Sequence, residues 1–172
     1  TVKAFAIAIE ARDPYTSGHC DRLSGYAISL GYELGMSPAE LEALRGGSLL
    51  HDVGKIGIRE DILQKSIALT PEEYDNMKHH PAIGKQILES IPAMKDILPL
   101  IYHHQERYDG TGYPDGLKGE QIPFGARIIA VVDAFDAMTS NRPYRKQFTL
   151  KKAIKELKNN SGTQFDPIIV TK

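Results

Sequence analysis

Apolar residues recur at helical spacing along most of this chain. The clearest stripe repeats every three or four residues, which is the period of one face of an α-helix. It predicts a helix that Thr16 or Ser17 caps and that Gly35 ends. Residues 3–12 predict an apolar helix before it, ending near Asp13-Pro14. The members of the stripe are Leu23, Tyr26, Ala27, Leu30 and Leu34.

Two four-residue segments carry the signal of a helix start. Ser37-Pro38-Ala39-Glu40 and Thr70-Pro71-Glu72-Glu73 each combine a capping box with proline at the first helical position. The first predicts a leucine-rich helix that runs to His51-Asp52, with Gly54 as its C-cap. Pro81 predicts that the helix after the second segment breaks or restarts behind His80.

The second half of the chain alternates helical patterns with one long loop. Residues 94–104 and 150–160 predict helices, and Asp166-Pro167 would start another. Residues 105–125 hold five glycines and two prolines and therefore predict a loop. The β-branched residues of 126–139 alone would also suit a strand, but the length of this run favours a buried helix. We predict an all-α fold in one domain, 1–172.

Composition narrows the possible partners. The 172 residues are 41% hydrophobic and 25% charged, with a net charge of −1, so there is no basic field for a DNA or RNA polymer. No apolar run is long enough to span a membrane. A single cysteine, Cys20, excludes an internal disulfide and favours a reducing, cytoplasmic setting. The apolar start at Thr1 predicts a piece of a longer signalling protein with an upstream sensor or receiver domain, and a membrane anchor in that parent stays open.

Histidine and aspartate usage points to metal chemistry. Asp133 interrupts the apolar run AVVDAF, and an unpaired buried carboxylate is costly unless a cation faces it. The alternatives to metal binding are that Asp133 lies on a solvent-exposed helix face and that His51-Asp52 is an ordinary helix end. Imidazole and carboxylate ligands suit first-row metals, and the candidate ligands are too many for one zinc ion. We predict two metals with Asp52 as a bridge, a site suited to phosphoester hydrolysis.

The order of these residues resembles the HD superfamily of metal-dependent phosphohydrolases, and further segments resemble its HD-GYP branch. The resemblance covers nearly the whole chain. The matching segments are EARDPYTSGH (10–19), HDVGK (51–55), DIL (61–63), HPAIG (80–84), HHQERYDGTGYP (103–114), GLKGEQIP (116–123), DAFDAMTSNRPYR (133–145) and GTQFDP (162–167).

The resemblance implies an HD-type helical bundle with a long GYP loop, and hydrolysis of cyclic di-GMP. The product would be linear pGpG and, in some members, GMP, in bacterial signal transduction. Two divalent ions, iron or manganese, would be bound. One would be held by His19, His51, Asp52 and Asp133, and the second by Asp52, His80, His103 and His104.

The same resemblance assigns substrate contacts. Lys55 would contact the phosphate or the bridging hydroxide, and Asp52, Lys55 and Asp136 would act in catalysis. Asp136, Arg142 and Arg145 would lie where the family positions nucleotide and phosphate, and Tyr113 would line the guanine side of the pocket. Without the resemblance, the alternative to a substrate contact is that Lys55 is a solvated lysine at a helix end. For Arg142 and Arg145 the alternative is that they are surface cations.

Two departures from the family pattern limit the expectation. Tyr15 stands where some members have a glutamate that binds a third metal, so we expect two metals. Arg145 replaces a lysine found in some members.

The alternatives to hydrolysis of cyclic di-GMP are a sensor or adaptor that binds cyclic di-GMP without turnover, and a hydrolase of another nucleotide. Further expected partners are a diguanylate cyclase (GGDEF) domain at the GYP loop and a second copy of the chain.

Overall fold

The computed structural model describes residues 2–10, 12, 18–140 and 146–172, and every regular element within them is helical. This confirms the all-α prediction; the described residues contain one isolated β-bridge, between Ser161 and Phe165. The α-helices are α1 (Val2–Glu10), α2 (His19–Glu33), α3 (Pro38–Leu50), α4 (Glu60–Leu63), α5 (Pro71–Met77), α6 (His80–Leu88), α7 (Leu98–His103), α8 (Phe124–Thr139), α9 (Leu150–Asn159) and α10 (Pro167–Val170). The 3₁₀ helices are η1 (Val53–Gly57), η2 (Pro92–Ile97) and η3 (Gly119–Gln121).

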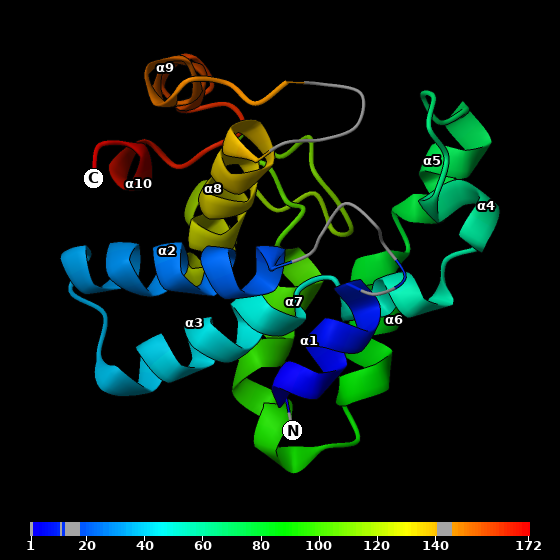
Figure 1. Cartoon of the computed structure of the whole chain (residues 1–172). Helices are drawn as coiled ribbons and strands as arrows, with labels where there is room; N and C mark the ends of the chain where they lie inside the picture. Colours follow the sequence, from blue (N-terminus) through cyan, green and yellow to red (C-terminus); the bar gives the residue numbers. More distant parts are fainter. Residues whose placement is uncertain (1, 11, 13–17, 141–145) are drawn as a thin grey trace.

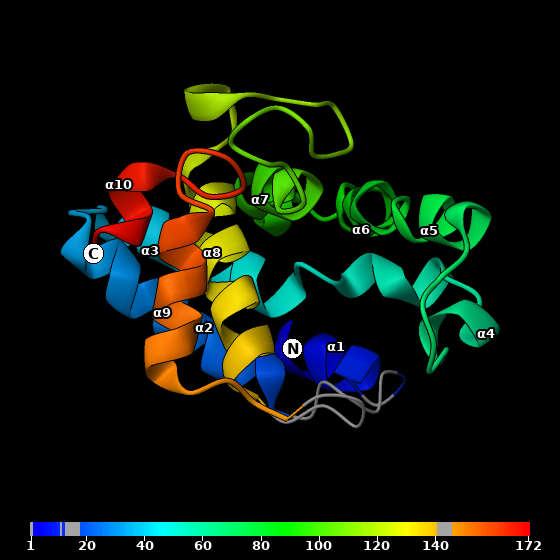
Figure 2. The same ribbon diagram turned by 90° about the horizontal axis from the view of Figure 1, so that it is seen from above.

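Helix α8 stands at the centre of the bundle. Helix α2 crosses one end of it with α3 alongside, and α9 and α10 pack on its outer side (Figure 1). Helices α7, α6 and α5 form a row that extends away from α8, and η1 lies against α6 (Figure 2). Helices α4 and α5 therefore lie at the opposite side of the molecule from α9 and α10 (Figure 1).

The core explains why α8 lies inside. Its Ile128 and Ile129 are fully buried and pack with Leu23 of α2 and Leu44 of α3. Each such side chain contributes roughly 1.5–3 kcal/mol when it leaves water. A second apolar cluster packs α1 against the residues directly before and after His51-Asp52. Its members are Ile9, Leu50, Val53, Leu88, Ile97 and Ile101.

Most helix starts follow the local signals. Both predicted capping boxes are present, and at the first of them the carboxylate of Glu40 accepts from the backbone N–H of Ser37 at 2.8 Å. The buried helix over 126–139, the helix over 150–160 and the start at Asp166-Pro167 are also confirmed. Pro81 restarts the chain as α6, three residues after the end of α5.

Three local predictions are corrected. Helix α2 begins at His19 with Gly18 as its N-cap, and Thr16 and Ser17 lie outside the described residues. The helix expected over 94–104 is divided into η2 and α7. Gly54 is not a C-cap, because it lies inside η1, where a Cβ would overlap the backbone carbonyl oxygen of His80. Glycine is required at position 54 by tertiary packing, which cannot be recognised from the local sequence pattern.

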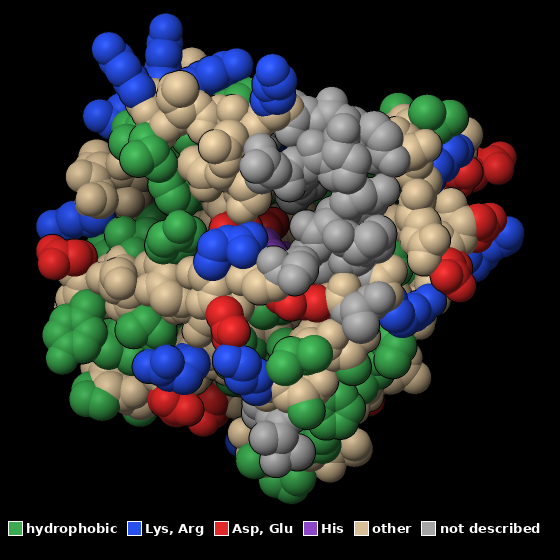
Figure 3. All heavy atoms as spheres, in the orientation of Figure 1, with side chains coloured by type: hydrophobic (Ala, Val, Ile, Leu, Met, Phe, Trp, Pro, Cys, Tyr) green, Lys and Arg blue, Asp and Glu red, His purple; other side chains and the backbone are tan. Residues whose placement is uncertain are grey.

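The surface is unevenly charged. Figure 3 shows lysine and arginine side chains gathered over α9, whose sequence is LKKAIKELKN. Very little histidine reaches this face of the molecule (Figure 3), because four of the six histidines are buried. In the part of the chain that the structure describes, no helix has the length and apolar character needed to cross a membrane.

Candidate metal centre and active site

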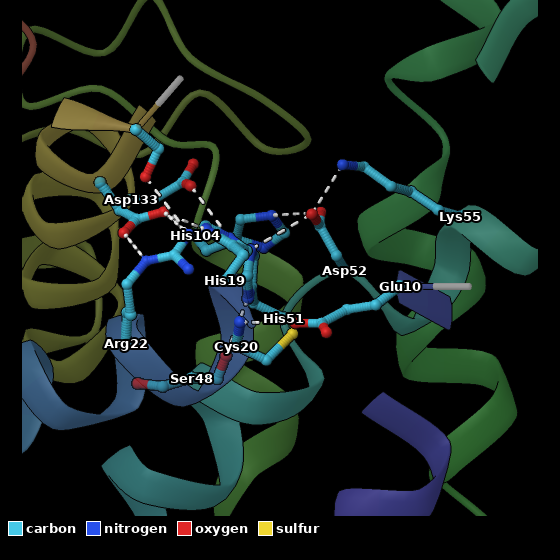
Figure 4. A network of polar contacts seen from close by, with 12 residues as sticks. Glu10, His19, Cys20, Arg22, Ser48, His51, Asp52, Lys55, His104 and Asp133 are labelled. Atoms are coloured by element: carbon cyan, nitrogen blue, oxygen red, sulfur yellow. Dashed lines mark hydrogen bonds and ion pairs between the residues drawn. The ribbon is translucent and has the colours of Figure 1, made fainter. Parts of the chain in front are cut away.

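Helix ends and one buried helix bring six predicted metal ligands together. Each offers a nitrogen or oxygen atom, and these atoms fall into two groups whose members lie within 4.8 Å of one another. The first group is His19, His51 and Asp133, and the second is Asp52, His80 and His104. Figure 4 shows the side chains of α2, α3 and α8 converging on one centre from different sides.

The backbone orients three of the four histidine rings in the same way. In each, Nδ1 donates to the carbonyl oxygen three residues earlier: His51 to Ser48 (2.9 Å), His80 to Met77 (2.8 Å) and His104 to Ile101 (2.7 Å). A carbonyl oxygen can only accept, so Nδ1 carries the proton and a neutral ring presents a lone pair on Nε2. These contacts are the outer support that metal-binding histidines usually have.

In the second group these lone pairs face one another. The Nε2 atoms of His80 and His104 are 3.1 Å apart, and Oδ1 of Asp52 lies 3.4 Å and 3.9 Å from them. Burial lowers the pKa of both imidazoles, and the neighbouring His80 and His51 lower that of His104 further. Two neutral rings cannot hydrogen-bond through two lone pairs, whereas a cation between them satisfies all three atoms. The donor set therefore fits a metal ion.

The first group has a similar unsatisfied atom. Nε2 of His51 is buried and lies 3.3 Å from Oδ2 of Asp52 without the geometry of a hydrogen bond. Burial would lower the pKa of His51, but the negative charges of Asp52 and Asp133 raise it to about 9. Without a metal ion this ring therefore carries a proton on Nε2 as well, and a cation bound there would take the place of that proton. Nε2 of His19 lies 3.5 Å from Oδ1 of Asp133. This group also suits a cation with nitrogen and oxygen ligands.

Asp52 joins the two groups through its two oxygens. Oδ1 faces His80 and His104, while Oδ2 faces His51 and lies 2.6 Å from Nζ of Lys55. Burial opposes ionisation, but the positive charges of Lys55 and His51 hold the pKa of Asp52 well below its usual range. The carboxylate is anionic and has the position expected of a bridge between two ions.

Asp136 lies behind His19 instead of in the substrate pocket. It is 2% exposed, its Oδ2 is 2.7 Å from Nδ1 of His19, and its Oδ1 accepts from Nε of Arg22 at 2.8 Å. Burial would raise the pKa of Asp136, but the hydrogen bonds from His19 and Arg22 lower it. Both oxygens of Asp136 thus contact His19 and Arg22, whereas its expected role as a substrate contact or acid stays a prediction.

His103 lies apart from both groups. Its ring packs against Tyr102 with centroids 4.7 Å apart, and its Nδ1 is 3.7 Å from Oε1 of Glu106. Consecutive side chains on a helix point about 100° apart, so the end of α7 turns only His104 inward. The structure does not bring His103 to the second group as the resemblance implied.

Comparison with known proteins decides the family. A family model described as "HD domain" matches residues 3–169, nearly the whole chain. The chain belongs to the HD domain family. The sequence resemblance that predicted this membership is thereby confirmed.

Curated relatives of this HD domain are bacterial phosphodiesterases. It is 44% identical over 97% of its length to the cyclic di-GMP phosphodiesterase response regulator RpfG of Xanthomonas campestris, and 40% over 94% to a cyclic di-GMP phosphodiesterase of Thermotoga maritima. It is 37% identical over 96% of its length to the 3′3′-cGAMP-specific phosphodiesterase 3 of Vibrio cholerae. The chain spans 45%, 44% and 36% of these proteins, respectively, which is less than half of each.

Solved structures show the same fold. A cyclic GMP-AMP specific phosphodiesterase of V. cholerae superposes with a TM-score of 0.75, at 20% identity, over 99% of this chain and 47% of its own. An HD-GYP-type protein of Bdellovibrio bacteriovorus gives a TM-score of 0.73, at 20% identity, over 99% of this chain and 62% of its own. These likenesses support the HD fold.

A polar cavity of about 270 Å³ opens beside the two ligand groups of this HD domain. Its lining includes His104, Asp133 and the side of the GYP loop that carries Tyr113. The Tyr113 ring lies edge-on to His80 with centroids 6.4 Å apart, and burial raises the pKa of its hydroxyl. The cavity therefore lies between Tyr113 and the second ligand group.

Some predicted residues lie outside the described part of the chain. They are Arg142 and Arg145, expected at the phosphates, and Tyr15, on which the expectation of two metals rested. Lys55 is described, and its ion pair with Asp52 places a cation directly at the ligand groups.

Arg22 is a further residue of the site, and it was not predicted from the sequence. This residue lies one turn after His19 on α2, and it fixes the carboxylate of Asp136 through Nε at 2.8 Å and Nη2 at 3.1 Å. The spacing of three residues, which puts Arg22 and His19 on one helix face, was the available signal. Its partner is 114 residues away, so the pairing itself could not be foreseen.

Proposed function

We propose that this HD domain is a metal-dependent phosphodiesterase that hydrolyses cyclic dinucleotides, with cyclic di-GMP as its substrate. The observation that carries the proposal is the pair of ligand groups joined by Asp52, in which the Nε2 atoms of His80 and His104 face each other at 3.1 Å. Two ions held together in this way suit the cleavage of a phosphodiester. The relatives named as cyclic di-GMP phosphodiesterases support the substrate.

We propose iron or manganese as the resident metals. The ligands are imidazole nitrogens and carboxylate oxygens, which suit these ions, and Cys20 is not a member of either group. His19, His51, Asp52 and Asp133 would hold one ion, and Asp52, His80 and His104 the other. When bound, the two ions would activate water and stabilise the charge that develops on the phosphate.

The residues of the chain have separate tasks in this proposal. Asp52 keeps the two ligand groups together and stays ionised. Lys55 adds a fixed positive charge next to Asp52, where a phosphate oxygen would arrive. Asp136 keeps the ring of His19 in one orientation, so it acts through a ligand and not on substrate. Tyr113 lines the cavity into which a nucleobase would extend.

A second substrate is favoured by a specific observation. Three relatives carry the name of 3′3′-cGAMP-specific phosphodiesterases, at 33–37% identity. These identities overlap with those of the cyclic di-GMP enzymes, so 3′3′-cGAMP is the second candidate. Pairing with a diguanylate cyclase domain and formation of a homodimer stay predictions from the sequence.

A nucleotide panel tests the proposal. The protein, loaded anaerobically with Fe(II) or Mn(II), is incubated with cyclic di-GMP, 3′3′-cGAMP and cyclic di-AMP, and the products are separated by chromatography. We expect linear pGpG from cyclic di-GMP, and no product from protein stripped of metal. Tight binding of cyclic di-GMP without turnover would contradict the proposal and favour a sensor. Turnover of the other nucleotides alone would reassign the substrate.

A further inference from the structure

The start of α2 is capped by a side chain from another helix. Its N-cap is Gly18, in the left-handed region with φ 67°, which has no side chain to accept from the first turn. Instead the carboxylate of Glu10, at the end of α1, accepts from the backbone N–H of Gly18 at 3.0 Å and of Cys20 at 2.7 Å. One carboxylate therefore satisfies two N–H groups that the helix itself leaves unpaired.

These two N–H groups flank the residue that holds the first metal in our proposal. His19 lies between Gly18 and Cys20, and it is the first residue of α2. Figure 4 shows the Glu10 side chain reaching across to Cys20 beneath the converging histidines. A negative charge at this end of the helix is also favoured by the helix dipole. Glu10 thus fixes the backbone from which His19 projects.

The ring of His19 has a separate support, so the backbone is the part that remains to be fixed. Asp136 holds Nδ1 at 2.7 Å, and Nε2 points to Asp133 at 3.5 Å. A shift of the first turn of α2 would move Nε2 away from Asp133 even with Asp136 in place. Both supports are needed to hold the ligand atom of His19 in position.

The end of α1, which carries Glu10, is fixed by packing and by a hydrogen bond close by. Ile9, its neighbour, is buried in the cluster with Leu50 and Val53, directly before and after His51-Asp52. Arg12 donates from Nη1 to the carbonyl oxygen of Ile56 in η1 at 2.7 Å. The end of α1 is therefore tied to the segment that carries Asp52 while its carboxylate holds the segment that carries His19.

We infer that Glu10 is a positioning residue for the metal centre: it caps α2 and so keeps His19 aligned with His51 and Asp133. The inference rests on the proposed metal-dependent function. Glutamine at this position has one acceptor oxygen and one NH₂ group, so it satisfies one of the two N–H groups and opposes the other. Losing outer support of this kind typically weakens metal binding about 10- to 100-fold.

The test compares two capping carboxylates in the full chain. Glu10→Gln is matched with Glu40→Gln, which removes the capping-box carboxylate of α3 at a helix end that carries no metal ligand. Mn(II) binding is titrated by the EPR signal of free Mn(II), and the denaturant midpoint of the metal-free protein is measured for each variant. We expect both midpoints to fall, and the Kd for Mn(II) to rise about tenfold in Glu10→Gln alone.

The outcomes separate the possible failures. If Glu10→Gln keeps the parent Kd, or if Glu40→Gln weakens Mn(II) binding equally, Glu10 has no positioning role. Glu10→Asp keeps the charge but is one methylene shorter, and it is also expected to raise the Kd for Mn(II). This variant is used for the test if Glu10→Gln does not fold. A parent protein that binds no Mn(II) would overturn the metal centre itself, and the inference with it.

Discussion

The Nε2 atoms of His80 and His104 face each other at 3.1 Å, while each Nδ1 donates to a backbone carbonyl three residues earlier. With Nδ1 protonated, neither ring can donate to the other unless it becomes charged. Burial works against that charge, since it lowers the pKa of both groups. The two rings are therefore suited to bind one cation between them.

Adjacent histidines should differ in their effect on metal content. His104→Ala is expected to lose one of the two bound ions, because it removes a member of the second group. His103→Ala, the matched control, should keep both, because His103 lies against Tyr102 and Glu106. Metal per chain is measured by inductively coupled plasma mass spectrometry after gel filtration. Loss of an ion in His103→Ala would show that both rings are ligands.

Replacing Asp136 should weaken metal binding and leave substrate affinity unchanged. Asp136→Asn loses the charged partner of His19 and Arg22, and the removal of such outer support typically costs about 10- to 100-fold in metal affinity. The Kd for Mn(II) and the KM for cyclic di-GMP at saturating metal distinguish the roles. An increased KM with an unchanged Kd would return Asp136 to the substrate pocket.

Gly54 should tolerate no side chain. In Gly54→Ala the new Cβ would overlap the carbonyl oxygen of His80, so we expect a loss of about 3 kcal/mol in unfolding free energy, the upper end for overpacking. Gly25→Ala in α2 is the control, because a Cβ there meets nothing within 4 Å and should stabilise the helix by up to about 1 kcal/mol. Urea unfolding of the metal-free proteins measures both. Equal stability of the two variants would contradict the close approach.

The single thiol should be unreactive in the folded protein. Cys20 is 7% exposed, and burial raises the pKa of its thiol, with the carboxylate of Glu10 acting in the same direction. At pH 8 the group is therefore the neutral thiol, which is the poor nucleophile. We expect no reaction with an aromatic disulfide reagent in native buffer and complete reaction in guanidinium. Rapid labelling of the native protein would show that the start of α2 opens.

Local signals in the sequence were sufficient where local chemistry determines the structure. The capping boxes at Ser37 and Thr70 involve residues three positions apart, and both were predictable. Gly54 was misread as a C-cap because its neighbour in space, His80, lies 26 positions later in the chain. A contact of that separation leaves no local pattern.

The metal ligands show the same division. Residue types indicated a site of imidazoles and carboxylates with Asp52 as the bridge, and the family resemblance named the six residues that form the two groups. Orientation was not predictable: the resemblance placed both His103 and His104 at one ion, whereas the helix turns one inward. The supports from Asp136 and Glu10 were also missed, since each acts across elements that meet only in the folded protein.

The central claim is a pair of ions bridged by Asp52. The most direct measurement is the EPR spectrum of the protein loaded with Mn(II), together with the number of Mn(II) ions per chain. We expect two ions per chain and an exchange-coupled spectrum, as for two ions about 3.5–4 Å apart, and loss of that coupling in Asp52→Ala. Two uncoupled ions, or a coupled spectrum that survives in Asp52→Ala, would contradict the bridged centre.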